Sequence, residues 1–167
     1  MALPPNVLEL ENRSLGRYSA PTLASAYERL KQYWDAGNHE REVALHLLFL
    51  AWYGLCEPAH ITGFETLDMP SDGLPARFAQ LQDTFNQVHK LIELQIDDDP
   101  EMLYVVGLMA HLFPYLLGDE REWTDRSERY RHRYRMLLPA GISPSVFEHR
   151  GAYGDYFAHQ ARGEGGF

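Results

Sequence analysis

The sequence predicts an all-α protein, folded as a single helical domain over residues 1–167. Three observations support this class. Apolar residues recur at steps of three and four in several long segments, which is the period of an amphipathic helix. Two further segments, 43–56 and 102–118, are apolar on nearly all sides, as helices at the centre of a core are. Alternation typical of strands is almost absent. We expect an irregular bundle of about five main helices.

The first twenty residues are expected to form an extended arm, and helices follow it. A helix over 21–36 carries an apolar stripe at steps of four, three and four. Gly37 can end this helix and Asn38 can cap the next one, over 39–55, so the two helices are expected to form a tight hairpin. The stripe of the first helix consists of Leu23, Tyr27, Leu30 and Trp34.

Segment 43–56, VALHLLFLAWYGLC, is the element that the rest of the chain is expected to cover. Its fourteen residues carry no acidic or basic side chain apart from the imidazole of His46. A bilayer requires about twenty apolar residues, so we expect a buried core helix and no membrane contact. Leu48 and Leu55, on the side opposite His46, are expected to be almost fully buried.

The second half of the chain starts with a long loop over 57–73, in which we expect a short helical turn. An amphipathic helix is predicted from about residue 75. Asp99 and Pro100 begin the next helix as its cap and first residue. Pro114 is expected to kink that helix, because proline has no N–H for the hydrogen-bond ladder.

Three further elements are expected after Gly118. A helix over 119–138 is followed by a brief helical turn over 143–148. The segment 151–167 is rich in glycine, and we expect a partly loose tail.

A short internal similarity is compatible with two stacked helical hairpins. Residues 37–42, GNHERE, resemble residues 118–122, GDERE, and a Pro-Ala pair follows 21 residues after each glycine. Chance accounts for a match of this length at least as well as a true repeat does.

Charge and cysteine content narrow the class of protein. The net charge is −9, all of it in residues 1–118, which is unfavourable for general contact with nucleic acid. Cys56 is the only cysteine, so no internal disulfide can form, and the N-terminus lacks the pattern of a signal peptide. We therefore expect a cytoplasmic protein.

Common catalytic signatures are missing, so we lean towards a protein without enzymatic activity and expect no cofactor. His39, Glu42 and His46 share one helical stripe and could hold a metal. The four-residue spacing of Glu42 and His46 also suits an ion pair or a hydrogen bond. We favour the second interpretation and predict no metal site.

A cleft lined by histidine and tyrosine is the main candidate for ligand binding. If the two all-apolar helices face each other, their polar rings would line a common space. The alternative, which we favour, is that each ring pairs with a backbone carbonyl or with water. The candidate residues are His46, Tyr53, Tyr104, His111 and Tyr115.

An arginine-rich segment over 126–135 is the second candidate site. Arg126, Arg129 and Arg133 could contact an anion or stack on bases. A solvated face, or pairing with the acidic turn 97–101, is favoured instead.

These patterns lead to one main hypothesis and two alternatives. The first is a helical protein–protein interaction module or a self-associating subunit, with a protein partner or a second copy as its target. The alternatives are a small-molecule binder or enzyme that uses the histidine–tyrosine cleft, and an anion or nucleic-acid contact through the arginines.

Overall fold

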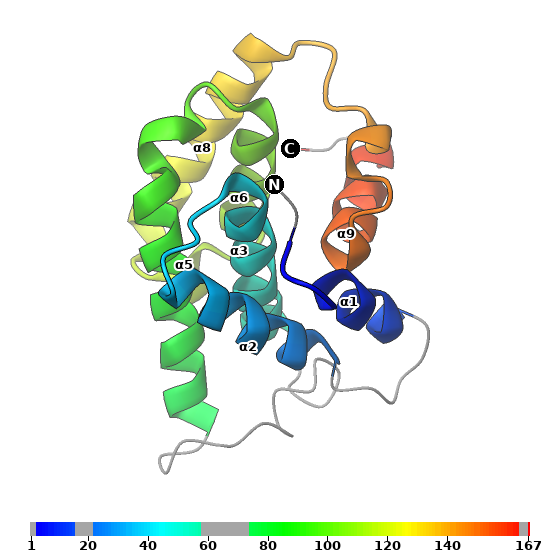
Figure 1. Cartoon of the computed structure of the whole chain (residues 1–167). Coiled ribbons are helices and arrows are strands. Elements are labelled where there is room, and N and C mark those ends of the chain that lie inside the picture. Colours follow the sequence, from blue (N-terminus) through cyan, green and yellow to red (C-terminus); the bar gives the residue numbers. More distant parts are fainter. Residues whose placement is uncertain (1–2, 16–21, 58–73, 164–166) are drawn as a thin grey trace.

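The computed structural model describes residues 3–15, 22–57, 74–163 and 167, and these residues contain helices and no strand (Figure 1). The all-α class is confirmed, but the chain forms more than the expected five helices. The helices are α1 (Val7–Leu15), α2 (Thr22–Asp35), α3 (Arg41–Cys56), α5 (Leu74–Ile96), α6 (Pro100–Leu112), α7 (Pro114–Leu117), α8 (Glu120–Leu137), the 3-10 helix η2 (Pro144–Phe147) and α9 (Gly151–Arg162).

Helix α3 lies at the centre of the molecule, between α2, α5 and α9 (Figure 1). Nearly all of its residues from Val43 to Leu55 are buried, and Leu48 and Leu55 are among them, as predicted. A helix that is apolar on every side needs neighbours on every side, and α3 has them.

The turn between α2 and α3 forms at Gly37, as expected. Gly37 has a φ of 95°, which glycine adopts without strain, and its N–H donates to the carbonyl of Trp34 at 2.9 Å. Asn38 does not cap α3, contrary to expectation. Its side chain donates back to the carbonyl of Tyr33 at 3.0 Å, and Glu40 occupies the N-cap position of α3.

Helix α6 starts as predicted and ends earlier. The Asp99 carboxylate caps it by accepting hydrogen bonds from the N–H groups of Glu101 and Met102, both at 3.0 Å. At the other end, Pro114 produces a break and not only a kink. Phe113 leaves the helical conformation, with φ −142° and ψ 64°, and α7 begins at Pro114. Proline restricts the residue before it, which explains the position of the break.

The two all-apolar helices pack mainly against different neighbouring helices. Helix α6 packs chiefly along α8, and α3 packs chiefly along α5, so contact between α3 and α6 is limited. None of the helices in the described part of the chain is long and apolar enough to span a membrane.

The N-terminal end of the chain differs from expectation. In place of an extended arm, residues Val7–Leu15 form α1, which turns Val7 and Glu11 inward at helical spacing. At the other end, Gly151–Arg162 form α9, which buries Tyr153 and Phe157 one turn apart. The looseness expected at the end of the tail falls mainly on 164–166, which lie outside the described residues. A helical turn was expected in 57–73, and residues 58–73 of this loop lie outside the described residues.

Candidate functional site

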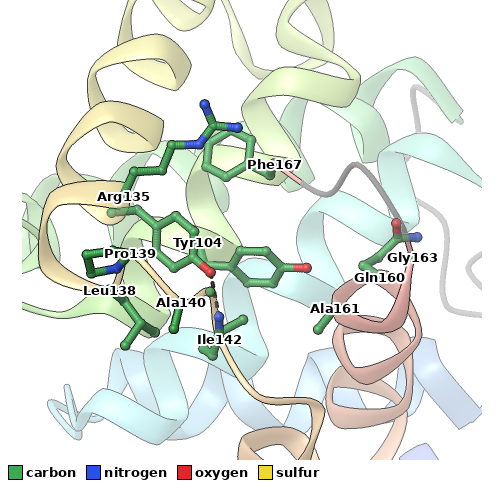
Figure 2. Close-up of a pocket in the computed structure, with 12 residues that line it drawn as sticks. Tyr104, Arg135, Leu138, Pro139, Ala140, Ile142, Gln160, Ala161, Gly163 and Phe167 are labelled. Carbon is green, nitrogen blue, oxygen red and sulfur yellow. Dashed lines mark hydrogen bonds between the residues drawn. The ribbon is translucent and has the colours of Figure 1, made fainter.

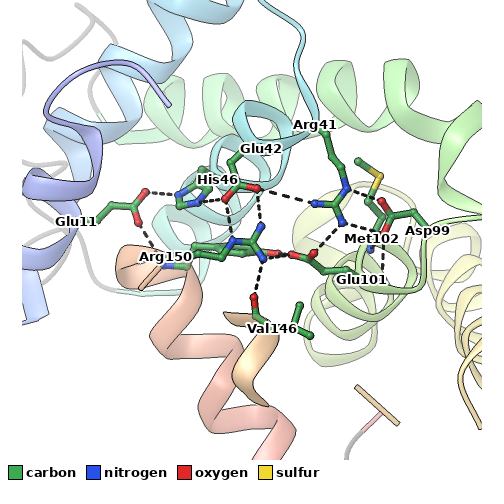
Figure 3. Close-up of polar contacts among 10 residues, drawn as sticks. Glu11, Arg41, Glu42, His46, Asp99, Glu101, Met102, Val146 and Arg150 are labelled. Atoms are coloured by element: carbon green, nitrogen blue, oxygen red, sulfur yellow. Dashed lines mark hydrogen bonds and ion pairs between the residues drawn. The ribbon is translucent and has the colours of Figure 1, made fainter. Parts of the chain in front are cut away.

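A polar network at the start of α3 connects four helices (Figure 3). It is fully buried at Glu11 and His46 and open to solvent at Arg41. It joins α1, α3, the first turn of α6 and the first turn of α9 through hydrogen bonds and ion pairs. We call it the carboxylate–arginine network, and its members are Glu11, Arg41, Glu42, His46, Asp99, Glu101, Arg150 and Tyr153.

His46 lies at one end of the network, completely buried. Its Nδ1 is 2.7 Å from Oε1 of Glu11, and its Nε2 is 3.2 Å from Oε1 of Glu42. Burial alone would lower the pKa of His46, but the charges of Glu11 and Glu42 outweigh burial and raise it above its ordinary value. Both ring nitrogens face a carboxylate oxygen, which can only accept, and the protonated ring satisfies both contacts by donating to each.

Arg150 holds the centre of the network. Its guanidinium donates twice to the carboxylate of Glu42, at 2.8 and 2.6 Å, and once to Glu101 at 2.5 Å. Two-point pairing of this kind fixes direction as well as distance. Burial would raise the pKa of Glu42, but hydrogen bonds from His46 and Arg150 lower it to about 2.

Arg41 closes the far end of the network. It donates to Asp99 at 2.6 Å and to Glu101 at 2.7 Å, so the cap of α6 is tied to the first residue of α3. The Tyr153 hydroxyl donates to Glu101 at 2.5 Å. Four carboxylates thus face two guanidinium groups and one imidazolium. The negative and positive charges nearly balance and each group is hydrogen-bonded, which offsets the free-energy cost of removing the charges from water.

Next to the network, α3 and α9 enclose a cavity of about 260 Å³ together with the start of α2. We call it the α2–α3–α9 pocket. Most of its surface is contributed by aromatic and aliphatic side chains. Its described lining residues are Leu23, Phe49, Tyr53, Ala152, Asp155, Tyr156 and His159.

Three aromatic rings form one wall of this pocket. The ring centroid of Phe49 lies 5.3 Å from that of Tyr53 and 5.7 Å from that of Tyr156, and the two tyrosine rings are 6.0 Å apart. Each ring therefore restrains the other two. The ring centroid of Phe49 also lies 6.0 Å from that of Tyr153, and the ring of Tyr153 lies tilted against that of His46 with centroids 4.7 Å apart. The aromatic wall is therefore in contact with the carboxylate–arginine network through Tyr153 and His46.

The polar groups of the pocket lie on one face of α9. Asp155 and His159 are exposed and stand one helical turn apart. Burial raises the pKa of Tyr53 and brings that of Tyr156 to about 12, so both hydroxyls stay protonated at neutral pH. The pocket thus offers an apolar wall, hydroxyl groups, and a carboxylate beside an imidazole.

The structure does not bring the five predicted cleft residues together. Tyr53 lines the α2–α3–α9 pocket, His46 belongs to the network, and Tyr104 lines a separate cavity near the end of α8. His111 and Tyr115 are exposed, and His111 lies against the ring of Phe167 with centroids 6.1 Å apart.

The predicted cleft does not form because the polar stripe of α6 faces a different helix. The Ser127 hydroxyl of α8 donates to the carbonyl of Gly107 at 3.1 Å, and the rings of Tyr104 and Tyr134 lie 5.4 Å apart. The stripe that contains Tyr104, Gly107 and His111 therefore faces α8, whereas the cleft hypothesis required it to face α3.

The three candidate arginines of α8 contact acidic groups, as favoured in the sequence. Arg126 pairs with Glu122 at 2.6 Å, and Arg129 approaches Glu93 at 3.8 Å. Arg133 pairs with Asp98 at 3.1 Å and donates to the carbonyl of Asp97 at 2.7 Å, which is the predicted contact with the acidic turn. These exposed pairs contribute little stability.

The sequence predicts one contact of the carboxylate–arginine network and does not predict the others. The pairing of Glu42 with His46 was predicted from their spacing and is confirmed. Glu11 and Arg150 were missed, because their partners lie 35 and 108 residues away in the sequence. Among the described residues, no group of three acidic, histidine or cysteine side chains is arranged to hold a metal ion.

Comparison with known proteins gives no family and no relative from which a function could be transferred. No family model matches the sequence, and no curated protein or solved structure matches it significantly.

Proposed function

We propose that this protein binds a small, mainly apolar molecule in the α2–α3–α9 pocket. The observation that carries the proposal is a cavity of about 260 Å³ with a wall of three mutually packed aromatic rings. Apolar concave sites with a few polar groups are the usual form of small-molecule sites. The volume lies just below the range of roughly 300–1,000 Å³ found for drug-sized ligands, which indicates a smaller compound.

The rim of the pocket points to a ligand with a basic end. The Asp155 carboxylate stands at the rim, one turn from His159, and the chain carries a net charge of −9. A ring-bearing amine would place its apolar body against Phe49 and Tyr156 and its ammonium group near Asp155. Aromatic faces also attract cations, so both features favour the same class of compound.

The proposed role is binding without catalysis. His46, the buried imidazole beside the pocket, has both nitrogens engaged by Glu11 and Glu42, so we assign it a structural role and no proton transfer. The network instead supports the pocket, because it fixes α9 against α3 and so holds the aromatic wall in place before a ligand arrives. Such preorganisation reduces the cost of binding.

Calorimetric titration with benzylamine tests the proposal. We expect saturable binding to the intact chain. Tyr53→Ala should weaken it by about tenfold or more, since one wall of the site is lost. Tyr33→Ala, at a partly buried tyrosine on α2 that does not line the pocket, is the matched control. Equal affinity in Tyr53→Ala and the intact chain would reject the proposal.

A second candidate function is contact with a protein partner or with a second copy of the chain. One observation favours it: α5 exposes Leu91 and Leu94, three residues apart on one side, with 51% and 95% of their surface accessible. Light scattering over a range of concentrations should show association that Leu94→Gln reduces. A strictly monomeric chain that captures no partner would remove this candidate.

We further propose that nucleic acid is not a partner. The ion pairs of Arg126, Arg129 and Arg133 support this, because these guanidinium groups already face carboxylates. The net charge of −9 adds repulsion from phosphate.

A further inference from the structure

A second cavity, of about 230 Å³, lies where the end of α8 and the turn after it meet α6 and the end of α9 (Figure 2). It is separate from the α2–α3–α9 pocket and shares no described lining residue with it. The described lining residues are Tyr104, Tyr134, Arg135, Leu138, Pro139, Ala140, Gly141, Ile142, Gln160, Ala161, Gly163 and Phe167.

The hydroxyl of Tyr104 is the unusual feature of this cavity. Tyr104 is only 2% exposed, and its hydroxyl oxygen is buried without a hydrogen-bond partner. Leaving a buried hydroxyl unpaired costs roughly 1–3 kcal/mol, and such groups are rare in folded proteins. Burial raises the pKa of Tyr104 above its ordinary value, so the group remains a phenol with a proton to donate.

The neighbouring polar groups are also donors. The Tyr134 hydroxyl accepts a hydrogen bond from the N–H of Ile142 at 2.7 Å, which leaves its own proton available. Arg135 adds a guanidinium group at the edge, and Gln160 adds an amide. No aspartate or glutamate occurs among the described lining residues, although the whole chain is strongly acidic.

Apolar side chains complete the cavity. Leu138, Ile142 and Ala161 contribute aliphatic surface, and Phe167 contributes a ring 6.3 Å from that of Tyr104. Gly107 makes room for that ring, since a β-carbon at this position would collide with Phe167. The cavity therefore combines hydrogen-bond donors and one positive charge with an apolar surface.

We propose that this cavity is a second binding site, for a small organic carboxylate. One carboxylate oxygen accepts the hydrogen bond that the Tyr104 hydroxyl cannot make within the protein. Arg135 adds positive charge from the edge of the cavity, beside Phe167 (Figure 2), and the apolar part of the ligand lies against Leu138 and Ile142. The site is independent of the first pocket, and its ligand carries the opposite charge.

Benzoate is the probe, with benzyl alcohol as its uncharged counterpart. We expect benzoate to bind the intact chain and to shift the amide resonance of Ile142. Tyr104→Phe removes only the hydroxyl and should weaken benzoate by about tenfold, the value of one hydrogen bond to a charged acceptor. Arg135→Gln removes the one positive charge at the edge and should reduce the preference for benzoate over benzyl alcohol. Tyr115→Phe, at an exposed tyrosine outside the cavity, is the matched control.

Two results would overturn the proposal. One is equal affinity for benzoate in Tyr104→Phe and in the intact chain. The other is the absence of benzoate binding to a folded intact chain, which would indicate that water alone satisfies Tyr104. Tyr53→Ala should leave benzoate binding unchanged, so failure of this site and failure of the α2–α3–α9 pocket can be told apart.

Discussion

Burying the imidazole of His46 costs free energy unless both of its nitrogens find partners. Glu11 and Glu42 supply them from two different helices, so the side chain that interrupts the apolar sequence of α3 also attaches α1 to it. The cost of burial is offset only while all three side chains are present. The residue that the sequence marks as a candidate ligand thus acts as a structural connection.

Replacing His46 is expected to destabilise the protein. His46→Ala removes the fully buried ring that pairs with Glu11 at 2.7 Å, and breaking a buried pair typically costs about 3–5 kcal/mol. Urea denaturation of this variant and of His132→Ala, at an exposed histidine of α8, measures the difference. A loss below about 1 kcal/mol for His46→Ala would show that the pairing is not required.

The contribution of His46 and Glu42 to stability is expected to depend on pH. The pKa of His46 is raised, so its contribution is complete below the unfolded value of about 6.5 and is lost as pH rises through the folded pKa. The pKa of Glu42 is lowered to about 2, so its contribution is present above about 4.3 and is lost as pH falls towards 2.

The stability difference between the intact chain and His46→Ala should therefore be largest between about pH 5 and 6.5. Denaturant melts from acid to alkaline pH measure it. A difference that stays constant over the whole range would contradict the assignment of charge in the network.

At the scale of elements, α3 is predictable because its apolar sequence requires cover on every side. Leu48→Ala is expected to cost about 2–5 kcal/mol, since Leu48 is fully buried. Leu94→Ala, at a leucine of α5 that is 95% exposed, is the matched control and should change stability by less than about 0.5 kcal/mol. A similar small effect for Leu48→Ala would mean that α3 is peripheral.

The two ends of the chain were harder to predict than α3, because their helices depend on contacts that local sequence patterns do not reveal. Residues 8–11, LELE, alternate as a strand does, but the same four residues also fit a helix. The burial of Glu11 depends on His46, which is distant in the sequence. In the same way, α9 depends on Gly154, which lies so close to the carbonyl of Phe147 that a side chain would not fit. Contacts of this kind leave no periodic pattern.

At the scale of the whole molecule, the sequence could not determine which helices pair. A helix that is apolar on all sides has no preferred face, so periodicity alone could not direct the stripe of Tyr104 and His111 towards α3 or α8. The structure turns it towards α8, so the candidates are divided among separate cavities. Tyr53 lines the α2–α3–α9 pocket, Tyr104 lines the cavity at the end of α8, and His111 lines a further cavity between α6 and α8.

A crystal structure of the chain with saturating benzylamine would show whether the α2–α3–α9 pocket is a binding site. We predict electron density for the ring against Phe49, Tyr53 and Tyr156, with the ammonium group towards Asp155. An unoccupied pocket at saturating ligand, or benzylamine bound only elsewhere on the molecule, would contradict the claim.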